Sequence, residues 1–105
     1  MRYQFIGIIC IILLAILYFS PAQAADGKGV FIQKCGNCHK AGSEAAVFAP
    51  TKYASTQWER FFQRNKHKRK KDISADFNQA ELDAVKQYLI DHAADSDQPE
   101  AVGLR

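Results

Sequence analysis

Apolar residues gather near the start of the chain into one uninterrupted run without a charged residue, residues 5–19. As a helix, 15 residues extend about 22 Å, which is shorter than the roughly 20 residues that span a bilayer. One basic residue precedes the run, and a Ser-Pro pair and the small-x-small pattern Ala22-Gln23-Ala24 follow it. This order is typical of a secretory signal with its cleavage site. We predict that residues 1–24 are a cleaved signal peptide; the alternative is an inner-membrane anchor through residues 5–19.

The periodic part of the chain starts shortly after this run. Residues 27–34 predict a short helix, and Val30 and Phe31 supply its apolar face. The next stretch, residues 40–53, contains Gly42, serine, several alanines and a proline. Such a composition favours a loop with one helical turn in it.

Two further helices are predicted from capping residues and from a 3.6-residue period. The first begins near Ser55 or Thr56, because Thr56 and Glu59 match a capping box. The second begins after Asn78, which pairs with Glu81 in the same way, and ends around residues 92–94. Their apolar stripes are Trp58, Phe61 and Phe62 in the first helix and Leu82, Val85 and Leu89 in the second.

The predicted fold class is all-α, because no segment alternates apolar and polar residues for long enough to form a strand. Without the signal peptide the chain has 81 residues, numbers 25–105, which is the size of one small domain. A domain of this size buries a limited core, so a covalent or metal-centred group would help to stabilise it. We therefore predict a single domain of three or more helices over residues 25–105.

The cysteines indicate the chemistry. The chain has three, and one of them, Cys10, leaves with the predicted signal peptide. The other two form, with the next histidine, the pattern C-x-x-C-H, which is the attachment signature of c-type haem. At this spacing the thiols reach the two vinyl groups of one porphyrin edge, and the histidine places its imidazole beneath the iron. We predict that Cys35 and Cys38 hold one covalent haem c and that His39 is its proximal ligand.

Three other interpretations of the pattern have less support. A thioredoxin-type dithiol uses C-x-x-C in a βαβ setting, and no strand is predicted here. A structural zinc site needs four ligands, and the pattern supplies three. A plain disulfide between Cys35 and Cys38 leaves His39 without a role. The non-haem dithiol protein stays the second alternative for the function.

Residues 27–39 resemble the N-terminal helix and haem-binding segment of class I cytochromes c. Residues 82–89 are similar to the C-terminal helix of that family, which packs across the first helix near Phe31. Pro50 is placed like the family's proline whose carbonyl accepts a hydrogen bond from Nδ1 of the proximal histidine, which leaves Nε2 free for iron. Residues 53–67 are more similar to the small dihaem cytochromes c, in which a tryptophan-led helix runs toward a histidine. The resemblance implies a cytochrome c-like fold around one haem and the function of an electron carrier, not an enzyme.

The distal ligand is expected to depart from the class I pattern. The single methionine is Met1, so the mature chain lacks the thioether that these cytochromes place opposite the histidine. His67 lies between the tryptophan helix and the last helix, where the family's distal ligand comes from, and we predict that it binds the iron. Imidazole in place of the thioether is expected to lower the redox potential.

Other distal ligands remain open at this stage. His92 is the second candidate, although its position at a helix C-terminus suits a structural role. A lysine, Asn65 or an open iron site are the remaining possibilities. An open site would make the protein a five-coordinate haem protein that binds or reduces a small ligand such as NO or O₂.

Charge and aromatic residues complete the prediction. Residues 64–71 carry six positive charges, whereas residues 81–100 carry six acids and one lysine. In an exported, periplasmic haem protein the basic segment favours attraction of a redox partner with an acidic docking face over nucleic-acid binding. Membrane contact is expected only if the signal segment is retained.

Five aromatic residues are predicted to form the core, and some of them to line the haem pocket: Phe48, Tyr53, Trp58, Phe61 and Phe62. Tyr53 or Trp58 is expected to donate a hydrogen bond to a haem propionate.

Overall fold

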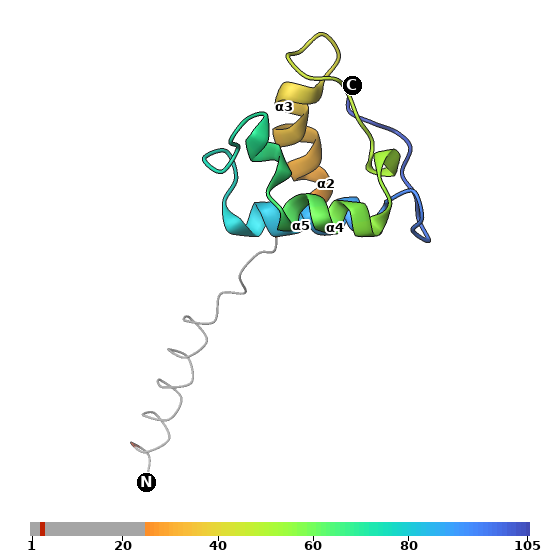
Figure 1. The fold of residues 1–105 in the computed structure, drawn as a ribbon. Helices are drawn as coiled ribbons and strands as arrows, with labels where there is room; N and C mark the ends of the chain where they lie inside the picture. The colour runs from red at the N-terminus through yellow and green to blue at the C-terminus, as the bar shows by residue number, and fades with distance from the viewer. Residues whose placement is uncertain (1–2, 4–24) are drawn as a thin grey trace.

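The computed structural model describes Tyr3 and residues 25–105 (Figure 1). This part of the chain consists of helices, turns and loops and contains no strand, which confirms the all-α prediction for it. No helix among the described residues is both long enough and apolar enough to cross a membrane. The predicted signal peptide and the alternative anchor at residues 5–19 lie outside the described residues.

One nearly continuous helix carries the C-x-x-C-H pattern. It consists of α2 (Gly27–Val30), the π-helical turn η1 (Phe31–Cys35) and α3 (Gly36–His39). In the π turn the Gly36 N–H bonds to the Phe31 carbonyl, five residues back, so the helix is locally wider. Such turns occur frequently at functional sites. The observed helix is therefore longer than the predicted residues 27–34, and its wider turn ends at Cys35, the first cysteine of the pattern.

The remaining elements follow the predicted order. The turn expected within residues 40–53 is η2 (Pro50–Lys52), and the basic segment, expected as a loop, contains the 3₁₀ turn η3 (Lys66–Arg69). Helix α5 (Gln79–Asp91) starts at the predicted cap, because Asn78 Oδ1 accepts from the Glu81 N–H at 2.8 Å. The Glu81 carboxylate in turn accepts from the Asn78 N–H at 3.1 Å. The helix ends at Asp91, one residue earlier than predicted.

Helix α4 (Ser55–Gln63) begins where the sequence predicts, but the proposed Thr56–Glu59 capping box is wrong. The Gln57 side-chain oxygen accepts from the Ala54 N–H at 2.8 Å. Asp95 Oδ1 accepts from the Ser55 N–H at 2.8 Å and from the Ser55 hydroxyl at 3.0 Å. The carboxylate that caps this helix thus comes from 40 residues further along the chain, beyond any local sequence pattern.

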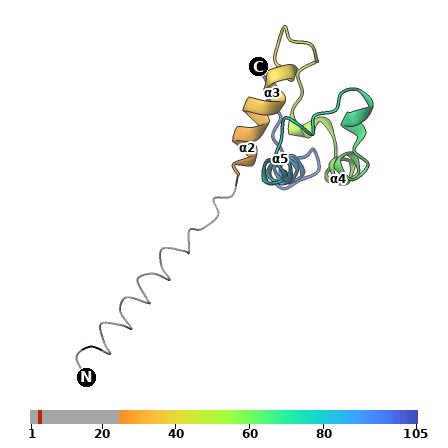
Figure 2. The ribbon, with the colours of Figure 1, turned by 90° about the vertical axis from the view of Figure 1, so that its left-hand side faces the viewer.

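Helices α4 and α5 lie side by side, and α2 crosses α5 (Figures 1 and 2). The crossing brings the rings of Phe31 and Tyr88 to 5.5 Å between centres, which confirms that the first and last helices pack near Phe31. Burying these faces against each other is what stabilises helices as short as these. The buried side chains form one cluster: Val30, Phe31, Trp58, Val85, Leu89, Ala93 and Leu104.

The C-terminal segment returns to the C-x-x-C-H helix. Backbone hydrogen bonds run from the Glu100 N–H to the His92 carbonyl at 3.0 Å and from the Leu104 N–H to the Phe48 carbonyl at 3.0 Å. Leu104 is buried, and its side chain approaches the helix at Gly36. Leu104, beyond the acid-rich residues 81–100, therefore packs on the domain.

The close approach of α2 to α5 requires a residue without a side chain at position 27. A Cβ on Gly27 would overlap the Ala84 carbonyl oxygen and lie 2.9 Å from Cβ of Tyr88. Because backbone atoms block it, Gly27→Ala is expected to lower the free energy of unfolding by about 1–3 kcal/mol, measured by urea denaturation. Gly29→Ala is the matched control, since its Cβ would meet only the Asp26 side chain and alanine favours a helix. Equal losses in the two variants would contradict this packing.

Candidate haem site

An apolar cavity lies between the C-x-x-C-H helix, α4, η3 and α5. It encloses about 100 Å³, is partly open to solvent and has a mostly apolar lining. Cys35 and His39 line it from the C-x-x-C-H helix, and His67 lines it from η3 (Lys66–Arg69). The five aromatic residues predicted as core, some of them as pocket lining, all line this cavity: Phe48, Tyr53, Trp58, Phe61 and Phe62.

The separation of the two histidines fits a shared metal ion. The ring centres of His39 and His67 are 6.3 Å apart, and the ring planes are inclined at 77°. With a bond of about 2.0 Å from metal to imidazole nitrogen, and about 1.1 Å from that nitrogen to the ring centre, two imidazoles on opposite sides of one metal ion would have centres about 6.2 Å apart, close to the observed distance. His67 is also the one residue of the segment 64–71 that is not exposed. The donor set therefore fits an iron held between two imidazoles.

Both histidines are held in the tautomer that metal binding needs. Nδ1 of His39 lies 2.7 Å from the Ala46 carbonyl oxygen, and Nδ1 of His67 lies 2.8 Å from the Lys71 carbonyl oxygen. A carbonyl only accepts, so each contact requires the proton on Nδ1. Nε2 of each ring is then the nitrogen left for a metal, which is the arrangement usual for metal-bound histidines.

The predicted role of Pro50 is wrong. Its carbonyl oxygen accepts from Nε1 of Trp58 at 2.8 Å, and the carbonyl that accepts from His39 is that of Ala46. The indole of Trp58 is 3% exposed, and a buried N–H needs an acceptor, which Pro50 supplies. Because this N–H is already used, Trp58 is also not the donor for a propionate. For Tyr53 that role stays a prediction.

The thiols do not have the character of a redox-active pair. Burial raises the pKa of Cys35 to about 11. The pKa of Cys38 is also raised, chiefly by its hydrogen bond to Glu44. Redox-active C-x-x-C pairs work through a thiol whose pKa is lowered. The environment of these cysteines therefore favours thiols that stay protonated, and it gives the dithiol alternative no support.

The alternative distal ligands lie elsewhere or have other partners. His92 is the residue directly after α5, with Nδ1 2.7 Å from the Gln98 carbonyl oxygen and its ring centre 4.8 Å from that of Tyr88. It is not among the residues that line the cavity. Asn65 has φ 47°, the left-handed conformation that turns the chain between α4 and η3. Both residues thus have structural roles in the part of the chain that the structure describes.

A haem iron needs few metal ligands from the protein. Among the described residues no three histidine, cysteine, aspartate or glutamate side chains gather around one point that could hold a metal ion. Haem brings four nitrogens of its own, and its iron takes only axial ligands from the chain. His39 and His67 are sufficient for that purpose.

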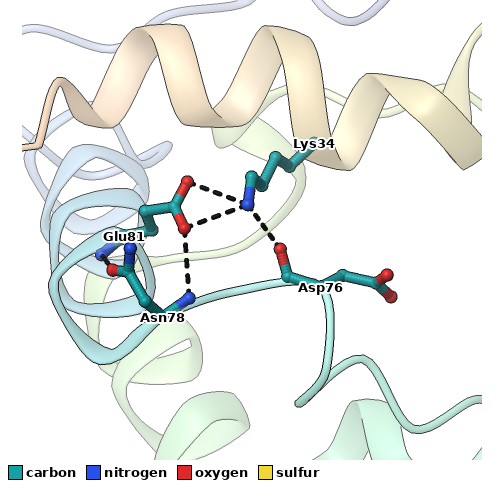
Figure 3. Close-up of polar contacts among 4 residues, drawn as sticks. All are labelled: Lys34, Asp76, Asn78 and Glu81. Carbon is teal, nitrogen blue, oxygen red and sulfur yellow. Dashed lines mark hydrogen bonds and ion pairs between the residues drawn. The ribbon is translucent and has the colours of Figure 1, made fainter.

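An ion pair fastens the C-x-x-C-H helix to the start of α5 (Figure 3). Lys34 Nζ lies 2.9 Å from both Glu81 carboxylate oxygens and donates to the Asp76 carbonyl at 2.5 Å. Its ammonium group also lies 5.6 Å from the ring centre of Phe77, which lines the cavity. Lys34 thus links the helix to the segment that closes one side of the cavity.

The Lys34–Glu81 ion pair and the Asn78 cap make part of the free energy of unfolding depend on pH. The Asn78 N–H, and secondly Lys34, lower the pKa of Glu81 below its ordinary value of 4.5. Ionised Glu81 therefore stabilises the fold fully above pH 4.5, and this contribution is lost as the pH falls through the lowered pKa. In Glu81→Gln the free energy of unfolding should fall less steeply between pH 5 and pH 2 than in the original protein. An unchanged slope in Glu81→Gln, or the same change in the exposed control Glu59→Gln, would contradict this prediction.

Several residues of the site carry no sequence signature. Ala46 and Lys71 act through backbone carbonyls, which every residue has. Lys52 lines the cavity with its ammonium group 5.4 Å from the ring centre of Tyr53.

Comparison with protein-family models, curated proteins and solved structures finds no match to the chain. The chemistry of the site follows from these residues and distances alone.

Proposed function

We propose that the protein is a c-type cytochrome that holds one covalent haem between two histidines and carries single electrons between redox partners. The observation that supports this most strongly is the His39–His67 pair. Its ring centres are 6.3 Å apart, and each Nδ1 is held by a backbone carbonyl. Both rings line one apolar cavity that Cys35 also lines.

Each residue of the site has a distinct role in this proposal. Cys35 and Cys38 attach the haem, His39 is the proximal ligand and His67 the distal one. The haem supplies a reversible one-electron couple when it is bound. The carbonyls of Ala46 and Lys71 orient the two imidazoles, and the aromatic wall excludes water. Two imidazoles, in place of a histidine and a methionine, are expected to give a lowered potential.

The five-coordinate alternative has less support. It requires an open distal side, whereas the ring centre of His67 lies 6.3 Å from that of His39 and its Nδ1 is already engaged. A protein of this kind would bind or reduce NO or O₂ at the free position. The proposed function is that of a carrier, alone or as a subunit of a redox enzyme complex, and not that of an enzyme itself.

The spectrum of the ferric protein tests the ligand assignment. Two imidazoles give low-spin iron without the near-infrared sulfur-to-iron band. A high-spin spectrum, or immediate stoichiometric binding of carbon monoxide by the ferrous protein, would favour the five-coordinate alternative. A sulfur-to-iron band would overturn the ligand set altogether.

The proposal includes the compartment and the partners. We infer export to the periplasm with removal of residues 1–24, or retention at the inner membrane through residues 5–19. The exposed basic residues of the segment 64–71 flank His67 in the sequence, so a positive potential is expected near the proposed distal ligand. This layout fits a redox partner with an acidic docking face and gives no reason to expect nucleic acid.

Electron exchange with a small anion is expected to depend steeply on salt. Oxidation of the ferrous protein by ferricyanide should slow severalfold between about 10 mM and 500 mM salt, because the screening length falls from about 30 Å to a few ångströms. With the cation hexaammineruthenium as the matched probe, the rate should rise instead. Salt-independent rates with both probes would count against attraction by the basic segment.

A further inference from the structure

One lysine connects the two sides of the candidate haem site. Lys71 Nζ lies 3.0 Å from Glu44 Oε1 and 3.8 Å from Cys38 Sγ, while its carbonyl oxygen accepts from His67 Nδ1 at 2.8 Å. Glu44 belongs to the loop that runs from His39 to the carbonyl of Ala46. The side chain of Lys71 thus contacts the proximal loop, and its backbone contacts the distal ligand.

The segment from His67 to Lys71 is a closed turn. The Lys71 N–H donates to the His67 carbonyl at 2.9 Å, and the His67 ring donates back to the Lys71 carbonyl. Because the two residues are bonded to each other in both directions, the His67 ring and the Lys71 backbone move as one unit. Every other residue of the segment 64–71 is exposed, so few further contacts hold this unit in place.

We propose that Lys71 is a positioning residue, whose ion pair with Glu44 holds the His67–Lys71 turn against the proximal loop and sets how often His67 leaves its place opposite His39. This inference depends on the proposed function, because it concerns the distal ligand of the haem. It assigns to the pair a role in ligand exchange and not in global stability.

The size of the expected effect follows from the exposure of the pair. The side chains of Lys71 and Glu44 are 52% and 62% exposed, and exposed pairs contribute little to the unfolding of a whole domain. Local opening of a loop with few contacts requires much less free energy than global unfolding. The small free energy of this ion pair is therefore a large part of the free energy that keeps the His67–Lys71 turn closed. Its loss should change the rate at which His67 leaves its place, while the midpoint of global unfolding hardly changes.

Carbon monoxide binding to the ferrous, haem-loaded protein measures this departure. At saturating carbon monoxide the rate is limited by the loss of the distal histidine. Lys71→Met and Glu44→Gln should each raise that rate about two- to fivefold, the factor that an exposed ion pair allows. The double variant should react no faster than either single variant, since both remove the same interaction.

Two further variants separate positioning from a general effect of charge. Lys71→Arg keeps the pair and should keep the rate near that of the original protein. Lys40→Met removes an equivalent positive charge from an exposed lysine next to His39 and should leave the rate unchanged. In the original protein, 1 M salt should raise the rate of carbon monoxide binding by a similar factor. In Lys71→Met the same salt should leave this rate unchanged.

The results also distinguish the two levels of the proposal. Unchanged rates in Lys71→Met and Glu44→Gln, with haem and a low-spin spectrum retained, would overturn the role of Lys71 and leave the proposed function intact. An equal increase in Lys40→Met would overturn it too. If a variant does not fold, a salt-independent rate of carbon monoxide binding in the original protein would still refute the proposed role of the Lys71–Glu44 ion pair. Absence of haem from the original protein would overturn both proposals.

Discussion

Replacing His67 with alanine is expected to free the distal position and convert the haem-loaded protein from low spin to high spin. Without its distal imidazole the ferrous protein should bind carbon monoxide immediately. If His67 occupies the site for 99% of the time, the free fraction is about 0.01, and its removal raises the apparent affinity about a hundredfold. This effect is large because the imidazole competes directly with the added ligand. Absorption spectra and carbon monoxide titration measure it.

The matched control for this variant is His92→Ala. It removes the same side chain from the end of α5, away from the cavity that His39 and His67 line. The control should keep the low-spin spectrum and the slow reaction with carbon monoxide. A low-spin spectrum that survives in His67→Ala, or that is lost in His92→Ala, would show that the distal ligand is misassigned.

Replacing Cys35 and Cys38 together with serine is expected to abolish covalent haem attachment. A serine hydroxyl does not replace the thiol that adds to a vinyl group, so haem should separate from the chain on a denaturing gel. The variant should also unfold at a lower temperature. A group that binds only the folded state stabilises it according to its concentration and affinity, and a haem that is free to leave provides less of that stabilisation.

The third cysteine of the chain provides the control. Cys10→Ser changes the same atom in the predicted signal peptide and should leave the covalent haem in place. The single variants Cys35→Ser and Cys38→Ser should each retain one thioether bond. Haem that stays with the doubly substituted chain on the gel would refute attachment through these two residues.

The helices could be predicted because their signals are local. The stripe of Leu82, Val85 and Leu89 and the Asn78 cap lie within a few residues of each other, and α5 forms where they predict it. The C-x-x-C-H pattern is local in the same way. The position of His67 and the lack of a methionine in residues 25–105 predict it as the distal ligand, and its distance from His39 fits that prediction.

The contacts that the sequence did not reveal join residues far apart in the chain or use backbone atoms. The cap of α4 depends on Asp95, 40 residues away, and no pattern within the helix indicates it. Any carbonyl can accept from His39, and residue type did not distinguish Ala46 from Pro50. The Lys71–Glu44 pair was hidden because Lys71 is one of six basic residues in its segment. Only the course of the chain in space selects among such equivalent groups.

Cys35 and Cys38 are expected to hold one haem covalently. The pyridine haemochrome spectrum of the purified original protein, combined with its protein concentration, tests this most directly. We predict one haem per chain, with the c-type spectrum that two saturated vinyl groups produce, and no thiol that can be alkylated at Cys35 or Cys38 after unfolding. A protein without haem, or one with unsaturated vinyl groups and two free thiols, would contradict the account.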